Sequence, residues 1–220
     1  MAGLIKNNFY SILGNLKLFL GFFFIMAVGF FITGNAILFI CLYAIVGLGM
    51  ALISVSGLGK EAASKWSMYK LSFPVKRKEI VKSFYVSHGV WTLLDVFLTM
   101  IVFALAVLFH GNQYFDLGLR DAIVLLTASG VVALMVGAIY CPLFHFWGAD
   151  KAEILMVLSL AGAVGFMALT SWIVNSVNGY ENVSDFRLYM GLLFVWVTAI
   201  IMFLFSYLLT STLFQKLQME

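Results

Sequence analysis

The chain alternates between long apolar runs and short polar interruptions. No charged residue occurs from Leu18 to Gly59, and this run is about twice the roughly 20 residues that one helix needs to cross a hydrocarbon core. Thr33, Gly34 and Asn35 supply turn-forming side chains near its middle. The pattern therefore predicts two membrane-spanning helices joined by a tight hairpin.

The rest of the chain extends this pattern after one long polar segment at residues 57–85. Four further apolar runs follow it, each long enough to cross a membrane, with short polar links between them. We expect the six helices at about 16–32, 36–55, 86–109, 122–146, 154–174 and 188–214. Pro142 lies near the end of the fourth helix, where a kink is tolerated because neighbouring helices satisfy the freed carbonyl. The predicted fold is an all-α membrane protein with a single domain over residues 1–220.

The composition supports this fold class. Hydrophobic residues make up 63% of the chain and charged residues 10%, which is typical of polytopic membrane proteins and excludes an ordinary soluble domain. Both cysteines, Cys41 and Cys141, lie inside apolar runs and have no metal-ligand spacing. The first residues contain no small-residue cleavage site after a compact apolar region, so we do not expect a cleaved signal peptide.

A second helical pattern occupies the N-terminal residues. Its apolar positions are Leu4, Ile5, Phe9, Ile12, Leu13 and Leu16, and its polar positions are Lys6, Asn7, Asn8, Asn15 and Lys17. This spacing predicts an amphipathic helix that lies in the headgroup plane of the membrane. A frayed terminal turn is the alternative.

Basic residues indicate the orientation of the chain, because cytoplasmic flanks accumulate Lys and Arg. Most of the basic residues fall in the terminal segments and in the links after the second and fourth helices: Lys6, Lys17, Lys60, Lys65, Lys70, Lys76, Arg77, Lys78, Lys82, Lys151 and Lys216. Only Arg120 and Arg187 fall on the opposite side. We therefore expect both termini and the segment 57–85 to be cytoplasmic.

The segment 57–85 has a helical pattern of its own. A helix there would place these residues on one face: Ala62, Trp66, Tyr69 and Phe73. Glu61 and Lys65 form a favourable pair four residues apart, and Pro74 disfavours helix at the residue before it. Aromatic side chains among lysines are typical of an anchor in anionic lipid, and spacing alone favours this interpretation. A protein-docking surface is the alternative, because Trp, Tyr and Arg anchor interfaces.

Polar residues also occur inside the third predicted helix. His88, Thr92, Asp95 and Thr99 share one face, and Asp95 lies about 10 residues into the span, where an acidic group costs roughly 2.5–3.5 kcal/mol on insertion scales. Such a face belongs in a bundle interior or along a water-filled pathway, and the pattern does not choose between these. No His or Cys cluster predicts a metal site.

The polar segment resembles a known family. Its matching residues are Glu61, Lys65, Trp66, Tyr69, Ser72, Pro74, Val75, Arg77, Ile80, Val81, Phe84 and Tyr85. Together with the six-helix pattern, they are similar to small permeases of the type-two class of ATP-binding-cassette (ABC) transporters, and most similar to the permeases of bacterial phenol-soluble modulin exporters. Phe73 stands where the family commonly has Leu, and Phe84 where Lys is common.

The resemblance implies a coupling helix in this segment that fits a cleft in a separate cytoplasmic ATPase. The residues expected to couple to it are Glu61, Lys65, Trp66, Tyr69, Pro74 and Arg77. The resemblance also implies an amphipathic helix before helix one, a dimer with a second copy or a sister permease, amphipathic membrane-active peptides as cargo, and a bacterial plasma membrane. ATP and magnesium would bind to the ATPase, and neither a cofactor in this chain nor a nucleic-acid partner is expected.

The absence of a phosphate-binding motif agrees with an ATPase on a separate chain. The phosphate-binding pattern G-x-x-x-x-G-K-[ST] does not occur, because Gly59 and Lys60 are followed by Glu61 and lack the earlier glycine. We therefore expect a transport subunit without enzymatic activity of its own. A non-transporting immunity or sensor protein that binds antimicrobial peptides is the alternative. An intramembrane enzyme is disfavoured, because Asp95 has no second acidic residue at its depth.

Overall fold

The computed structural model describes residues 2–63, 77–111, 113–114, 119–178 and 184–216. The elements are α1 (Ala2–Thr33), α2 (Ala36–Ala63), α4 (Arg77–His110), α5 (Leu119–Trp147), the 3₁₀ turn η1 (Ala149–Lys151), α6 (Ala152–Asn178) and α7 (Asp185–Lys216). Within these residues, six helices are long and apolar enough to cross a membrane. The prediction of an all-α, six-helix membrane protein is confirmed.

The observed helices extend beyond the apolar runs that predicted them. At one end, α2 continues through Gly57 to Ala63, and α4 begins at Arg77 instead of Val86. Hydropathy marks only the part of a helix that suits hydrocarbon, whereas backbone hydrogen bonding continues into the interface, where lysine side chains reach water. Only residues 64–76 of the polar segment lie outside the described part of the chain.

The predicted hairpin between the first two helices is present at Gly34 and Asn35. Gly34 has a φ of 62°, a left-handed conformation that glycine adopts without steric cost, and its amide donates to the Phe30 carbonyl. The Asn35 side chain accepts a hydrogen bond of 2.8 Å from the Ile37 amide and so caps α2. Turn chemistry therefore ends α1 and starts α2 within two residues.

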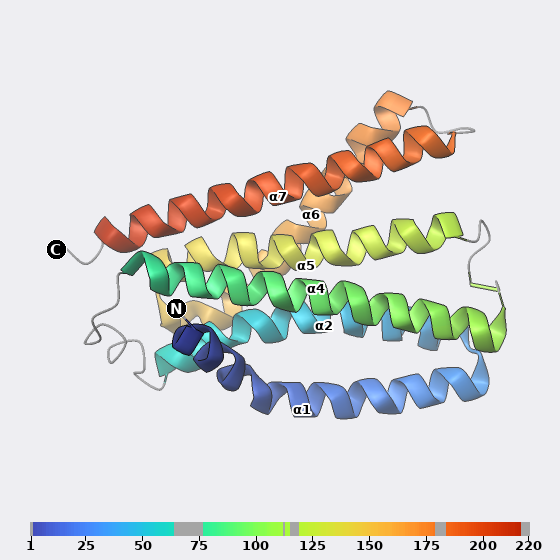
Figure 1. Ribbon diagram of the computed structural model, residues 1–220, viewed down its shortest axis with the longest axis horizontal. Helices are drawn as coiled ribbons and strands as arrows, with labels where there is room; N and C mark the ends of the chain where they lie inside the picture. Colours follow the sequence, from blue (N-terminus) through green and yellow to red (C-terminus); the bar gives the residue numbers. More distant parts are fainter. Residues whose placement is uncertain (1, 64–76, 112, 115–118, 179–183, 217–220) are drawn as a thin grey trace.

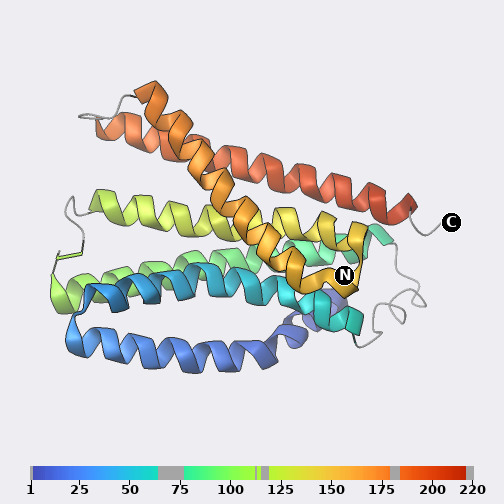
Figure 2. The ribbon, with the colours of Figure 1, turned by 180° about the vertical axis from the view of Figure 1, so that it is seen from behind.

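Helix α5 lies at the centre of the bundle. It packs against α2, α4, α6 and α7, and most positions between Thr127 and Cys141 are buried (Figures 1 and 2). Small residues along α5 let neighbouring backbones approach closely, which is the usual basis of helix association in lipid. Pro142 lies inside α5, and the helix continues to Trp147. Helix α1 flanks α2 and α4, whereas α6 crosses the back of the bundle obliquely (Figure 2).

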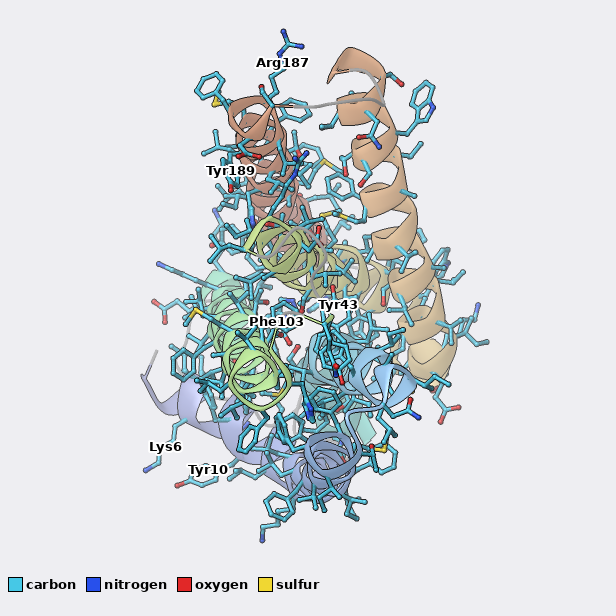
Figure 3. The ribbon with its side chains drawn as sticks, turned by 90° about the vertical axis from the view of Figure 1, so that its right-hand side faces the viewer. Lys6, Tyr10, Tyr43, Phe103, Arg187 and Tyr189 are labelled. Atoms are coloured by element: carbon cyan, nitrogen blue, oxygen red, sulfur yellow. The ribbon has the colours of Figure 1, made fainter. Side chains whose placement is uncertain are left out.

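The two ends of the bundle differ in charge. The start of α1, the end of α2, the start of α4 and the end of α7 lie at one end of the bundle (Figure 1). We call it the lysine end because it carries Lys60, Lys78, Lys82 and Lys151. The opposite arginine end carries Arg120 and Arg187, and Figure 3 shows Arg187 at the outer edge of the molecule. The cytoplasmic placement of the lysine end stays a prediction from charge.

The N-terminal residues are helical, and their predicted place in the headgroup plane stays a prediction. They are continuous with the first span in α1, although Figure 1 shows the first turns bent away from the rest. Ile12 is buried, and the ring centroids of Phe9 and Trp91 of α4 are 5.2 Å apart. Asn8, expected on the polar side, is buried and donates to Ser83 of α4, because an amide leaves water only where it finds a partner.

Candidate functional site

The four polar residues singled out on α4 are all buried. His88, Thr92, Asp95 and Thr99 are 0–5% exposed, on the side of α4 that meets α2 and α5. Ser54 of α2 and Ser129 of α5 complete this group, which we call the polar cluster. The helical spacing of the four residues brings them onto one face, and the neighbouring helices enclose that face.

His88 connects three helices. Its Nε2 lies 2.9 Å from the Ala133 carbonyl of α5, which can only accept, so Nε2–H is the donor. Its Nδ1 lies 2.7 Å from Ser54 Oγ of α2 and can only accept in the neutral ring, so the single Ser54 proton is shared between Nδ1 and the Ala51 carbonyl, which is also 2.7 Å away. Gly137 leaves the space for the ring, since a Cβ there would lie within 3.0 Å of Nε2, Cδ2 and Cε1.

Asp95 is held by a serine of the central helix. Ser129 Oγ donates to Asp95 Oδ2 at 3.0 Å, and Thr99 Oγ1 donates to the Asp95 carbonyl at 2.9 Å. Asp95 Oδ1 has no hydrogen-bond partner in the part of the chain that the structure describes. Gly47 of α2 makes room for Ser129, because a Cβ at this glycine would lie 2.7 Å from Ser129 Oγ.

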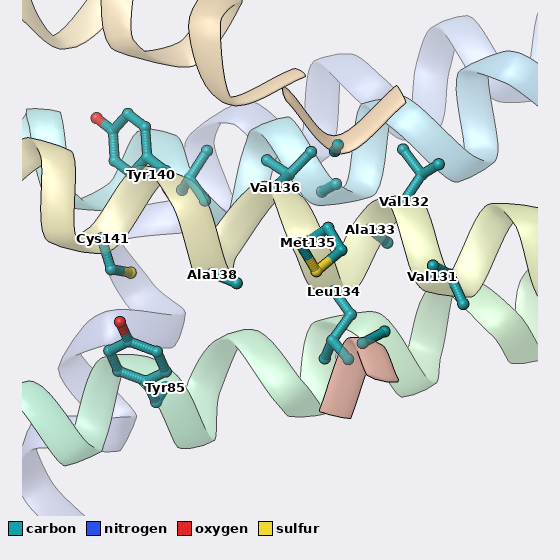
Figure 4. Packing of buried hydrophobic residues seen from close by; sticks show 14 of the residues in the cluster. Tyr85, Val131, Val132, Ala133, Leu134, Met135, Val136, Ala138, Tyr140 and Cys141 are labelled. Carbon is teal, nitrogen blue, oxygen red and sulfur yellow. The ribbon is translucent and has the colours of Figure 1, made fainter. Parts of the chain in front are cut away.

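A second set of hydrogen bonds ties α4 to α7. Tyr85 OH lies 2.7 Å from Ser206 Oγ and 2.8 Å from Thr210 Oγ1, and Ser206 Oγ donates to the Ala138 carbonyl of α5. Figure 4 shows Tyr85 beside α5, with its hydroxyl toward Cys141. This set belongs to the largest apolar cluster, which spans α2, α4, α5, α6 and α7.

Toward the arginine end, contacts between α2 and its neighbours are largely aromatic. The rings of Tyr43 and Phe103 stack with centroids 5.9 Å apart (Figure 3), and Tyr43 OH donates to the Leu125 carbonyl of α5 at 2.8 Å. The Tyr43 hydroxyl therefore joins α2 to α5 without involving α4.

The Ser54–His88 contact has the spacing of a nucleophile and its base, which sequence analysis did not find because the two residues lie on different helices. Catalysis is nevertheless disfavoured. The Ser54 hydroxyl also faces the Ala51 carbonyl at 2.7 Å, and the other ring nitrogen is engaged by a carbonyl instead of an acid. The α5 backbone at Gly137 also lies directly against the ring. Among the described residues, no group of three metal-ligating side chains occurs.

The side chains of the residues expected to couple to an ATPase lie outside the described part of the chain. Glu61 lies in the last turn of α2 and Arg77 begins α4, but their side chains are outside the described part. Lys65, Trp66, Tyr69 and Pro74 lie outside the described residues altogether. Their contact with an ATPase stays a prediction.

The sequence pattern did not reveal the members of the polar cluster that lie on α2 and α5. Ser129 and Gly137 were not singled out, and Ser54 was not expected to contact His88. The small size of these residues was the available signal, since small side chains in membrane helices mark close contacts. Their individual partners depend on how the helices are aligned with one another, which the period of one helix does not encode.

The comparison with known families covers nearly the whole chain. A family model described as "ABC-2 family transporter protein" matches residues 3–215, a range that includes all six membrane helices and the segment between α2 and α4. No curated protein and no solved structure matches the chain.

Proposed function

Because the chain belongs to the ABC-2 family of transporter proteins, we propose that it forms half of the membrane pathway of an ATP-driven exporter. Membership makes it a multi-pass membrane subunit of an ABC transporter, a class that works with an ABC ATPase. The family match over residues 3–215 is the observation that carries the proposal.

The ATPase is proposed to be a separate chain that docks at the lysine end. The 220 residues contain no phosphate-binding loop, and the segment 57–85 is the longest polar stretch between spans. The helices on both sides of it, α2 and α4, extend past the apolar runs and carry Lys60, Lys78 and Lys82. These helices would transmit a movement of the segment directly to the helix bundle.

The cargo and assembly rest on the resemblance. A second copy or a sister permease would complete the pathway, and amphipathic membrane-active peptides would be exported. The polar cluster is enclosed by three helices of one chain, which supports a role in holding α4 against α2 and α5 over a role in lining the pathway. Its burial follows the rule that intramembrane polar groups face protein.

A paired substitution tests the docking site. Trp66→Ala with Tyr69→Ala should leave insertion intact, remove aromatic anchors and reduce copurification of the ATPase. The matched control is Trp172→Ala with Tyr189→Ala, which removes the same side-chain types from exposed positions near the arginine end. Equal ATPase recovery from both double variants would contradict docking at Trp66 and Tyr69.

A second measurement tests the transport function itself. The purified complex, reconstituted in lipid vesicles, should hydrolyse ATP faster when an amphipathic helical peptide is added than when a scrambled, non-amphipathic peptide is added. If no ATPase copurifies with the unsubstituted chain, the non-transporting immunity or sensor hypothesis becomes the better explanation.

A further inference from the structure

We infer that Ser83, Tyr85 and His88, in the first turns of α4, transmit movement of the segment before α4 to four other helices through three different side chains. We call these three residues the α4 junction. The inference rests on the proposed function, in which an ATPase moves that segment. The α4 junction determines which helices follow the movement.

The first branch leads to α1. Asn8 Nδ2 donates to Ser83 Oγ at 3.3 Å, and Ser83 Oγ donates its own proton to the Ile80 carbonyl at 2.7 Å. Ser83 therefore acts as the acceptor toward Asn8. Both side chains are buried, so water does not compete for this contact.

The second branch leads to α7. Thr210 donates to the Ser206 carbonyl and Ser206 donates to Ala138, so the Tyr85 hydroxyl is the donor toward the oxygens of this pair. The ring of Tyr85 also contacts Phe203 and Tyr207 of α7, at centroid distances of 5.0 and 5.4 Å. Removing only the hydroxyl would keep these ring contacts.

The third and fourth branches both start at His88. Its two ring nitrogens bond Ser54 of α2 and Ala133 of α5. Within six residues, α4 thus has polar contacts with α1, α7, α2 and α5. At 100° per residue, Ser83 points to a different side of the helix from Tyr85 and His88, so the contacts spread around the helix axis.

Hydrogen bonds suit this role better than apolar packing. Apolar contacts are non-directional and tolerate sliding, whereas hydrogen bonds require defined distances and angles. A rigid helix that shifts at the α4 junction must therefore either carry its bonded neighbours along or break the bond to each. Loss of one branch is expected to weaken transmission to one helix more than to the others.

The test uses reporters on three helices at the arginine end. Single cysteines that carry an environment-sensitive fluorophore replace exposed residues near the starts of the helices: Ile37 on α2, Leu119 on α5 and Phe186 on α7. The background chain has Cys41→Ala and Cys141→Ala. The complex with its copurified ATPase, reconstituted in lipid vesicles, is trapped with ATP and vanadate, and the fluorescence change of each reporter is recorded.

Two variants should give reciprocal patterns. Tyr85→Phe removes the proton that Ser206 and Thr210 share, which should lower the equilibrium constant for movement of α7 about fivefold; the response at position 186 should therefore fall while that at position 37 is unchanged. Ser54→Ala should lower the response at position 37 and leave position 186 unchanged. Tyr43→Phe is the control, because it removes a hydrogen bond between α2 and α5 that does not involve α4, and should leave position 186 unchanged.

The outcomes distinguish failure of the transport function from failure of transmission through the α4 junction. If no reporter responds in the unsubstituted chain, the proposed function is overturned and the inference with it. If the unsubstituted chain responds but Tyr85→Phe and Ser54→Ala lower all reporters equally, or lower none, transmission through the α4 junction is refuted while the transporter stands. A loss at position 186 in Tyr43→Phe equal to that in Tyr85→Phe would show a general structural effect and also refute it.

Discussion

Gly137 offers the sharpest test of the polar cluster. An alanine at this position would place its Cβ within 3.0 Å of three atoms of the His88 ring, including 2.7 Å from Cε1. The ring cannot withdraw freely, because Ser54 and Ala133 hold it from two sides. We therefore expect Gly137→Ala to destabilise the protein even though alanine is the better helix former.

The magnitude follows from three effects. Overpacking a well-filled interior costs about 1–3 kcal/mol, and displacement of the ring from one hydrogen bond costs about 1 kcal/mol. The higher helix propensity of alanine stabilises the folded state by up to about 1 kcal/mol. The expected net loss in free energy of unfolding is therefore about 1–3 kcal/mol, with overpacking as the largest contribution.

Gly165→Ala is the matched control. Gly165 lies inside α6, and a Cβ there would meet no atom within 4 Å, so only the propensity gain remains. Stability is measured by denaturant titration of the purified protein in mixed micelles, followed by far-UV circular dichroism. Equal midpoints for Gly137→Ala and Gly165→Ala would refute the close contact between α4 and α5.

A double variant identifies the cause of any loss. His88→Ala removes the ring that the new methyl group meets, so its effect and that of Gly137→Ala should not add. We expect His88→Ala with Gly137→Ala to be more stable than the sum of the single effects predicts, by at least about 1 kcal/mol. Strict additivity would show that Gly137 acts through something other than His88.

Three further predictions use the same stability assay or labelling of cells. Ser129→Ala removes the hydrogen bond donor to Asp95 Oδ2 and should cost about 1–3 kcal/mol, and an unchanged stability would contradict this contact. Arg120→Ala breaks an exposed ion pair with Asp185, at 3.4 Å, and should change stability by less than about 1 kcal/mol; a larger loss would reveal an additional role. In a cysteine-free background, an impermeant maleimide should label Arg187→Cys on intact cells and Lys151→Cys only after lysis, and the reverse would invert the predicted orientation.

The order and positions of the membrane helices were predictable because each helix satisfies its backbone hydrogen bonds internally. A membrane helix needs no distant partner for its hydrogen bonds, so apolar length and turn residues suffice to place it. Thr33, Gly34 and Asn35 located the hairpin correctly for this reason. Helix ends were less predictable at the lysine end, where α4 starts at Arg77 in a polar environment that a hydropathy pattern does not mark.

The polar cluster was predictable on one side only. The spacing of His88, Thr92, Asp95 and Thr99 is a property of α4 alone, and all four proved to be buried. Their contacts with Ser54 and Ser129 depend on how α2, α4 and α5 are aligned with one another. Gly47 and Gly137 permit the close approach of these helices. The burial of Asn8 was unpredictable for a related reason, because its partner Ser83 lies on another helix.

The position of Asp95 bears on the route of transport. Its carboxyl group is enclosed by helices of one chain, so a pathway between two permeases would run along other faces of the bundle. The described residues on those faces are rich in exposed Phe, Leu, Ile and Met, especially along α1, α6 and α7. Apolar side chains on these faces suit contact with lipid, whereas Asp95 needs the protein interior. The burial of Asp95 therefore follows from the same membrane environment that leaves the outer faces apolar.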